Sequence, residues 1–231
     1  METLTNRFTL ETPPGCFPLT TDSMALADFA AIRGGKSVLD LGSGCGTLGL
    51  LLCARNERCR VAGVELDEKA HTAALENIRR NRLDARMESI CADMRRVPEL
   101  FAPGSFDCCI SNPPYFSGGF AAQLTAARRE DRCTLADLMR CAAWALKYGG
   151  DLFLVHRPER LAEAIALGAQ HQLETKRLRL LRHREGSPVA LVLLQLRKGG
   201  KPGLTLDEIA LHRSDGSESG DYRRIYHIAE D

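Results

Sequence analysis

A glycine-rich segment is the first feature of the chain that could do chemistry. It reads Asp40-Leu-Gly42-Ser-Gly44-Cys-Gly46 and begins within an expected buried strand over residues 37–41. Glycines let a ligand approach the backbone closely, and the first amides of a following helix then face that ligand. The pattern is Gly-x-Gly-x-Gly, not the Gly-x-Gly-x-x-Gly of dinucleotide sites. The carboxylate of Asp40 suits a cationic group better than a pyrophosphate.

Two more acids follow the next two expected strands. Glu65 ends the second strand, 19 residues after Gly46, about the spacing at which an acid meets ribose hydroxyls in doubly wound folds. Asp93 closes the third strand, where it could accept a hydrogen bond from an exocyclic amine. One acid for an ammonium, one for a ribose and one for an adenine amine describe S-adenosylmethionine. The structural alternatives are a loop cap for Asp40, a helix cap for Glu65 and a surface turn for Asp93.

The fourth expected strand runs directly into Ser111-Asn112-Pro113-Pro114-Tyr115-Phe116. The amine of adenine is a poor nucleophile because its lone pair is delocalised into the ring. Two acceptors on its N–H bonds would favour the pyramidal nitrogen of the transition state. The Asn112 amide oxygen and the Pro113 carbonyl can supply them, and Tyr115 or Phe116 can stack on a base. The structural alternative is a rigid turn after a strand.

Strands and helices alternate along most of the chain, which predicts a parallel sheet covered by helices on both faces. The fold class is therefore α/β, a Rossmann-like, seven-stranded, mostly parallel sheet with an antiparallel edge pair. Residues 1–35 form an arm and a helix, 36–198 the main domain, and 199–231 a polar tail that we expect to be only partly ordered. The expected strands are 37–41, 60–66, 85–91, 105–111, 151–156, 173–181 and 188–196, and the expected helices are 47–55, 67–82, 134–147 and 158–168.

The composition of the chain limits which binding partners and which cellular compartment we expect for it. Lys and Arg number 31 and Asp and Glu 30, so the chain as a whole is not a basic polyanion binder, although a local basic face remains possible. No apolar run approaches the roughly 18 residues of a membrane helix, and the N-terminus lacks an apolar signal core. The nine cysteines contain no Cys-x-x-Cys pair. We expect reduced thiols, no metal site and a cytoplasmic protein.

Taken together, these motifs resemble the class I S-adenosylmethionine-dependent methyltransferases, and among them the amino-group methyltransferases with Asn-Pro-Pro-Tyr. This resemblance is carried by DLGSGCG (40–46), GVEL (63–66), AD (92–93) and SNPPYF (111–116). Up to about residue 200 the chain also resembles the bacterial tRNA1(Val) (adenine-37 N6)-methyltransferase family. The segments similar to that family are LTTDSMALADFA (19–30), ENIRRN (76–81), ARRED (127–131), PERLAEAI (158–165) and KRLRLLRHREGSP (176–188).

The resemblance implies a role for each matching residue. The chemistry would be carried by Asn112, Pro113, Pro114 and Tyr115. The family often has Ala-Arg-His-Glu where this chain has Arg129 at the third position, which leaves that position without an inherited role. The cofactor would be held by Asp40, Gly42, Gly44, Glu65 and Asp93, with Leu66 against its adenine and Thr21 and Asp22 near its methionine part.

Two basic clusters fit an RNA partner. One lies between Lys176 and Arg184 and includes Arg177 and Arg179; the other contains Arg128 and Arg129. Phosphate contacts from such groups give salt-sensitive affinity that does not depend on base sequence. The alternative for each cluster is a solvated, ordinary charged surface.

The leading functional hypothesis is N6-methylation of an adenine in structured RNA, in particular tRNA next to the anticodon. The main alternative is N5-methylation of a protein glutamine, as in release factor methyltransferases, because an amide nitrogen has the same delocalised lone pair. A DNA adenine methyltransferase, a ribosomal RNA guanine N2-methyltransferase and a non-catalytic RNA-binding relative of the fold are weaker alternatives. The sequence leaves the tRNA species, the base and the oligomeric state open.

Overall fold

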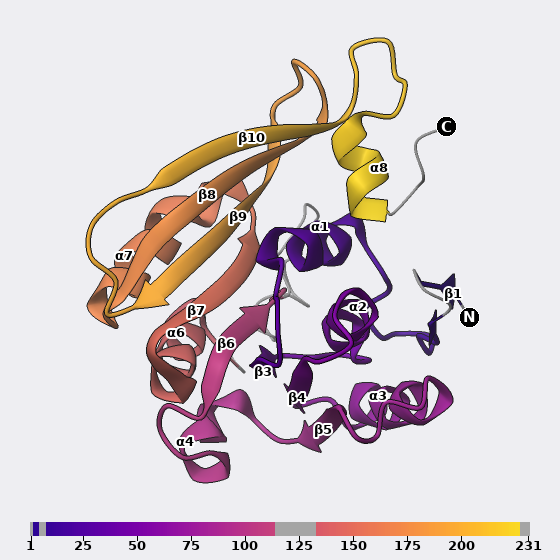
Figure 1. Cartoon of the computed structure of the whole chain (residues 1–231), viewed down its shortest axis with the longest axis vertical. Helices are drawn as coiled ribbons and strands as arrows, with labels where there is room; N and C mark the ends of the chain where they lie inside the picture. Colours follow the sequence, from indigo (N-terminus) through magenta and orange to yellow (C-terminus); the bar gives the residue numbers. More distant parts are fainter. Residues whose placement is uncertain (1, 5–7, 114–132, 227–231) are drawn as a thin grey trace.

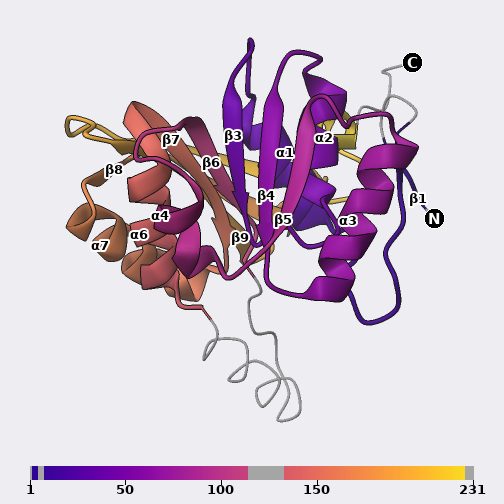
Figure 2. The same cartoon turned by 90° about the horizontal axis from the view of Figure 1, so that it is seen from below.

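The computed structural model of the chain describes residues 2–4, 8–113 and 133–226. The predictions for Pro114, Tyr115, Phe116, Arg128 and Arg129 lie outside these residues. A central sheet with the strand order β10-β8-β9-β7-β6-β3-β4-β5 carries helices on both faces (Figures 1 and 2). This confirms the α/β class.

The elements of the sheet appear in the order that the sequence predicts up to residue 198. Strands β3 to β7 are mutually parallel, and β9 runs antiparallel to both β7 and β8. The strands are β3 (Ser37–Leu41), β4 (Arg60–Glu65), β5 (Met87–Cys91), β6 (Phe106–Ser111), β7 (Leu146–His156), β8 (Leu173–Arg184), β9 (Val189–Lys198) and β10 (Thr205–His212), with a separate short pair β1 (Glu2–Thr3) and β2 (Thr9–Leu10).

Helices cover both faces of the sheet because successive strand residues point to opposite sides. In β3, Val38 packs into one apolar core and Leu39 into the other, and Phe153 and Leu154 of β7 divide in the same way. The strands therefore read as continuous apolar runs. The first core contains α1 (Thr21–Ala30), α2 (Thr47–Arg55), α3 (Glu68–Arg80) and α8 (Gly220–Tyr226), and the second contains α4 (Val97–Leu100), α6 (Leu135–Ala145) and α7 (Leu161–Gln170).

The sheet has eight strands rather than the seven expected, because the segment expected as a partly ordered tail supplies the outermost one. β10 pairs in parallel with β8, so the antiparallel strand β9 lies two positions in from the edge. Residues 220–226 then form α8, which packs beside α1. The first four residues of β10 are exposed or half-buried, and only Ile209 and Leu211 in this strand are buried, so the polar segment looked like a solvated tail.

Arg177 and Arg179, which we expected to contact phosphate, both lie against other side chains of the protein. The Arg179 guanidinium donates to both carboxylate oxygens of Asp207 on β10, at 2.8 and 2.6 Å, and its side chain is only 14% exposed. The Arg177 guanidinium lies 4.3 Å from the centroid of the Phe29 ring. In this structure both arginines therefore contact other parts of the protein, and phosphate binding by them stays a prediction.

One carboxylate joins four elements in this region. Asp28 of α1 is 11% exposed and lies 3.5 Å from the guanidinium of Arg55, 3.9 Å from that of Arg179 and 3.4 Å from that of Arg224. These arginines belong to α2, β8 and α8. Removing a carboxylate from among partly buried guanidinium groups leaves them uncompensated, which costs more than the pair itself contributes.

We expect Asp28→Asn to lower the free energy of unfolding by about 2–3 kcal/mol, because it removes the carboxylate that the three arginines share while keeping the side-chain shape. Urea unfolding at neutral pH measures it. The matched control is Glu99→Gln, which breaks the exposed Arg96–Glu99 pair and should cost less than about 1 kcal/mol. Equal losses in the two variants would show that Asp28 does not join these elements.

Candidate active site

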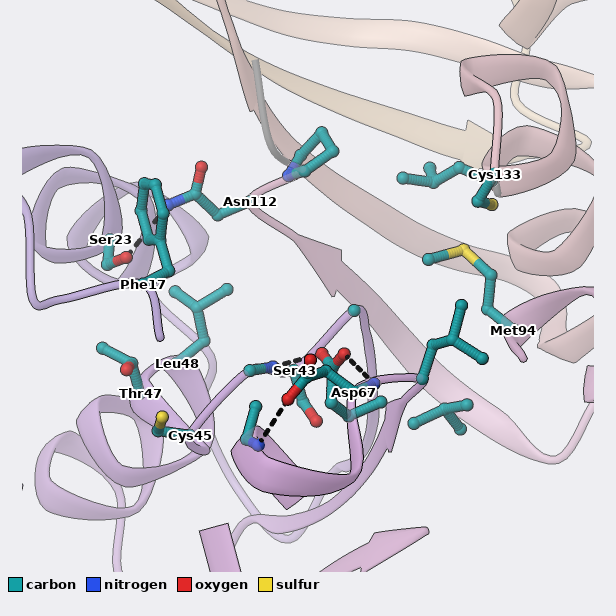
Figure 3. Close-up of a pocket in the computed structure, with 18 of the residues that line it drawn as sticks. Phe17, Ser23, Ser43, Cys45, Thr47, Leu48, Asp67, Met94, Asn112 and Cys133 are labelled. Carbon is teal, nitrogen blue, oxygen red and sulfur yellow. Dashed lines mark hydrogen bonds between the residues drawn. The ribbon is translucent and has the colours of Figure 1, made fainter. Parts of the chain in front are cut away.

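A pocket of about 490 Å³ opens at the carboxyl ends of the central strands. Its walls come from the glycine loop, the ends of β4 and β6, the turn after β5, the start of α6 and the N-terminal arm (Figure 3). Ligands bind at this edge in open α/β sheets, and the volume falls within the range of small-molecule sites. The pocket is thus the candidate site of chemistry.

The glycine loop forms one wall through its backbone. Gly42, Gly44 and Gly46 all have positive φ angles, of 76, 55 and 83°. At Gly46 the φ of 83° favours glycine, and a Cβ there would also lie 2.9 Å from the terminal methyl of Met87, which would have to move. Gly42 and Gly44 line the pocket, and α2 begins directly after Gly46. The loop therefore presents main chain rather than side chains to a ligand.

Glu65 lies where the loop meets the end of β4. Its Oε2 accepts a hydrogen bond from the Gly44 amide at 2.7 Å and its Oε1 accepts one from the Asp67 amide at 2.8 Å. The N-cap of α3 is Asp67, whose side chain accepts a hydrogen bond from the Ala70 amide. Glu65 is therefore not the cap of this helix. Each carboxylate oxygen keeps a free lone pair. Glu65 and the 42% exposed Leu66 both line the pocket.

Asp93 and Met94 form the wall beyond Leu66. The Asp93 carboxylate accepts from the Arg95 amide at 2.9 Å and from the Arg95 guanidinium. These guanidinium hydrogen bonds lower the pKa of Asp93, which therefore stays ionised at neutral pH. The thioether of Met94 lines the pocket beside it.

Asp40 is not on the pocket wall. It is fully buried, and neither of its carboxylate oxygens has a hydrogen-bond partner of normal geometry among the described residues. Burial, together with the nearby Glu65 charge, raises the pKa of Asp40 to about 8. We expected this carboxylate to face the ammonium of the ligand. It instead lies at the end of β3 beneath the loop, in surroundings that favour the neutral acid.

Thr21 and Asp22 also lie off the pocket wall, and their neighbour Ser23 lines it instead. The Thr21 hydroxyl is 2.9 Å from the Tyr226 hydroxyl of α8. Burial raises the pKa of Asp22, and the charge of Arg157 opposes this effect. In this segment Ser23, one residue further on, makes the contact with the cavity, and a role for Thr21 and Asp22 near the cofactor stays a prediction.

Asn112 follows β6 and lines the pocket, and its side chain is directed toward Ser23 (Figure 3). Its Nδ2 donates to the Ser23 hydroxyl at 3.0 Å, whereas its Oδ1 is buried and has no partner among the described residues. Pro113 lines the pocket next to it. A buried acceptor without a donor is costly, and the described residues leave this oxygen without one.

Sequence reasoning missed the N-terminal arm as a pocket wall. Cys16 and the 47% exposed Phe17 line the cavity. The arm is held by Asn77, whose amide accepts from the Glu11 amide at 2.9 Å and donates to the carbonyls of Glu11 and Cys45. Asn81 binds Thr9 in the same way. Two asparagines four residues apart share one face of a helix, and this spacing was the available signal.

Within residues 2–4, 8–113 and 133–226, no helix is long and apolar enough to cross a membrane. In the same residues there is no cluster of three or more His, Cys, Asp or Glu side chains that could hold a metal ion.

Comparison with known protein families is consistent with this geometry. The family model described as "Methyltransferase small domain" matches residues 14–177, which include the glycine loop, Glu65, Asp93 and Asn112. The chain belongs to this family. This methyltransferase has the glycine loop and acidic strand ends of the class I fold, and it uses S-adenosylmethionine as its methyl donor.

Curated relatives and solved structures resemble this methyltransferase over most of its length. The tRNA1(Val) (adenine(37)-N6)-methyltransferase of Serratia proteamaculans is 30% identical over 89% of this chain and 80% of its own. That of Tolumonas auensis is 32% identical over 87% and 85%. The crystal structure of a predicted O-methyltransferase from Agrobacterium tumefaciens has a TM-score of 0.75 at 24% identity, covering 90% of this chain and 96% of its own. The last similarity shows the fold alone.

We expect Asp40→Asn to stabilise the ligand-free protein, by an amount that grows as the pH rises from about 4 to about 8. The unfolded carboxyl has a pKa near 3.9, and that of the folded one is about 8. Between these values the folded state holds a proton that the unfolded state has lost, so wild-type stability falls as the pH rises, whereas asparagine does not titrate. Thermal unfolding of both proteins from pH 5 to 9 measures the difference. A constant difference across that range would show that Asp40 is ionised throughout.

Proposed function

We propose that this methyltransferase transfers a methyl group to the N6 atom of an adenine in tRNA, at position 37 beside the anticodon. The observation that carries the proposal is the unpartnered, buried Oδ1 of Asn112 in the pocket. The support for the nucleic acid comes from the relatives, which are named for this reaction and match over four-fifths or more of their own length. Such an enzyme would act in the cytoplasm.

The cofactor fits the wall made by Gly42, Gly44, Glu65, Leu66 and Asp93. Glu65 has free lone pairs for ribose hydroxyls, Leu66 offers an exposed apolar surface for an adenine ring, and Asp93 is an ionised acceptor for the ring amine. Asp40, Thr21 and Asp22 lie behind this wall rather than on it. When bound, S-adenosylmethionine supplies an electrophilic methyl group.

Asn112 and Pro113 act on the target amine. The Asn112 Oδ1 accepts one N6–H bond and the Pro113 carbonyl accepts the other, which favours a pyramidal nitrogen with its lone pair localised for attack. The new bond joins N6 to the methyl carbon as the bond from that carbon to sulfur breaks, and the product ammonium then releases a proton to water. Pro114 and Tyr115 complete the motif that the sequence assigns to this chemistry, and Tyr115 or Phe116 would stack on the base.

Arg177 and Arg179 are engaged with Phe29 and Asp207, which leaves Arg128 and Arg129 as the other candidates from the sequence for contacts with the RNA backbone. The alternative substrate, a protein glutamine, would use the same two acceptors. The curated relatives favour the nucleotide.

Direct assay of methyl transfer tests this function. The protein should label an unmodified tRNA1(Val) transcript from S-adenosylmethionine and should not label the same transcript with guanine at position 37, because only adenine presents an N6 amine there. Tritium incorporation measures both, and a release factor serves as the protein substrate. Labelling of the release factor but of neither transcript would assign the glutamine reaction instead.

We expect Asn112→Ala to lower kcat by about 100-fold or more while the Kd for S-adenosylmethionine stays within about twofold. Losing one preorganised acceptor affects the transition state more than the ground state. Single-turnover kinetics on tRNA and calorimetry with the cofactor provide the two values. The matched control is Asn56→Ala, since Asn56 directly follows α2 and donates to the carbonyls of Ile32 and Gly34 in the segment after α1, and it is not on the pocket wall. Normal turnover in Asn112→Ala would contradict the mechanism.

A further inference from the structure

The side chain that contacts the Asn112 amide comes from a distant part of the chain. Ser23 stands in the first turn of α1, 89 residues before Asn112, and its hydroxyl oxygen accepts from the Asn112 Nδ2 at 3.0 Å (Figure 3). We propose that Ser23 is a positioning residue that keeps the Asn112 amide turned with its oxygen toward the reacting amine. This proposal rests on the proposed function, in which that oxygen is the acceptor.

The two ends of an asparagine side chain have nearly the same shape and opposite hydrogen-bonding character. With Oδ1 toward the pocket, the amide accepts an N6–H bond. Turned by 180°, it would direct two N–H bonds at the two N–H bonds of adenine, and the contact would become repulsive. The orientation of this amide therefore decides whether the site attracts or rejects its substrate.

Among the described residues, Ser23 provides the hydrogen bond that can fix the orientation of the Asn112 amide. Its Oδ1 has no partner among the described residues, and the hydrogen bond to Ser23 is the one that the described residues give to its Nδ2. Ser23 itself is only 3% exposed, so water does not readily replace its oxygen. Without this hydroxyl, the Nδ2 loses an acceptor and the amide gains freedom to rotate.

The place of Ser23 is fixed by the rest of α1. Phe29, two turns further along the helix, packs edge-on against Phe153 of β7 at 6.3 Å between ring centroids. Asp28 lies among the arginines of α2, β8 and α8. The helix is thus bound to the sheet at its far end, and its first turn presents the serine to Asn112.

The first test replaces the hydroxyl alone. Ser23→Ala should lower kcat about three- to tenfold, the effect of one ordinary hydrogen bond, with the KM for tRNA and the Kd for S-adenosylmethionine unchanged. The matched control is Ser37→Ala at the opposite end of β3, which loses its hydrogen bonds to Asp107 and Ser105 and should keep full turnover. A kcat for Ser23→Ala equal to that of the wild type would overturn the proposal.

The second test separates positioning from general damage. If Ser23 acts only through Asn112, adding Ser23→Ala to Asn112→Ala should cause no further loss in single-turnover rate, whereas independent roles would multiply. Side-chain amide resonances of Asn112, assigned by their loss in Asn112→Ala, should shift in Ser23→Ala but not in Ser37→Ala. Multiplying losses or unmoved resonances would overturn the proposal while leaving the methyltransferase reaction intact. Full activity in Asn112→Ala would instead contradict the proposed function.

Discussion

The architecture around the pocket depends on one carboxylate. Asp28 lies between guanidinium groups from α2, β8 and α8, and its own helix carries the serine that contacts Asn112. Three cations gathered at a partly buried place would repel one another without it. The Asp28 carboxylate therefore ties α1, which supplies one wall of the site, to α2, β8 and α8.

The chemistry of the site was easier to predict from the sequence than its exact contacts. The glycine loop, Glu65, Asp93 and Asn112 are adjacent to strand ends, and in a parallel sheet those ends share one edge, so their meeting follows from the order of the elements. Asp40 shows the limit of this reasoning. Its place at the end of β3 was correct, but whether its carboxylate faces the cavity or the interior depends on strand alternation at a single residue.

The outer part of the sheet was harder to predict for a different reason. β10 gains its stability from pairing with β8 and from the contacts of Asp207 and Glu208 with Arg179 and Arg182. Such long-range pairs leave no periodic pattern of their own. In the basic run that resembled a phosphate-binding surface, Arg179 and Arg182 are therefore paired with these two acids of β10. Residues 114–132, which contain Tyr115 and two of the candidate arginines, lie outside the described structure.

The position of α8 has a consequence for synthesis on the ribosome. Strands β3 to β9 leave the ribosome before β10 and α8, and a chain folds as it emerges. Until those last elements appear, Asp207 and Arg224 cannot join Arg179 and Asp28, and Thr21 has no Tyr226 beside it. The nascent chain can therefore assemble its glycine loop early, but it completes the wall that carries Ser23 only after α8 has been released. A chain that lacks these last elements would thus expose a half-formed pocket. In that chain Arg55 would lack the Ile225 carbonyl and Arg179 would lack Asp207.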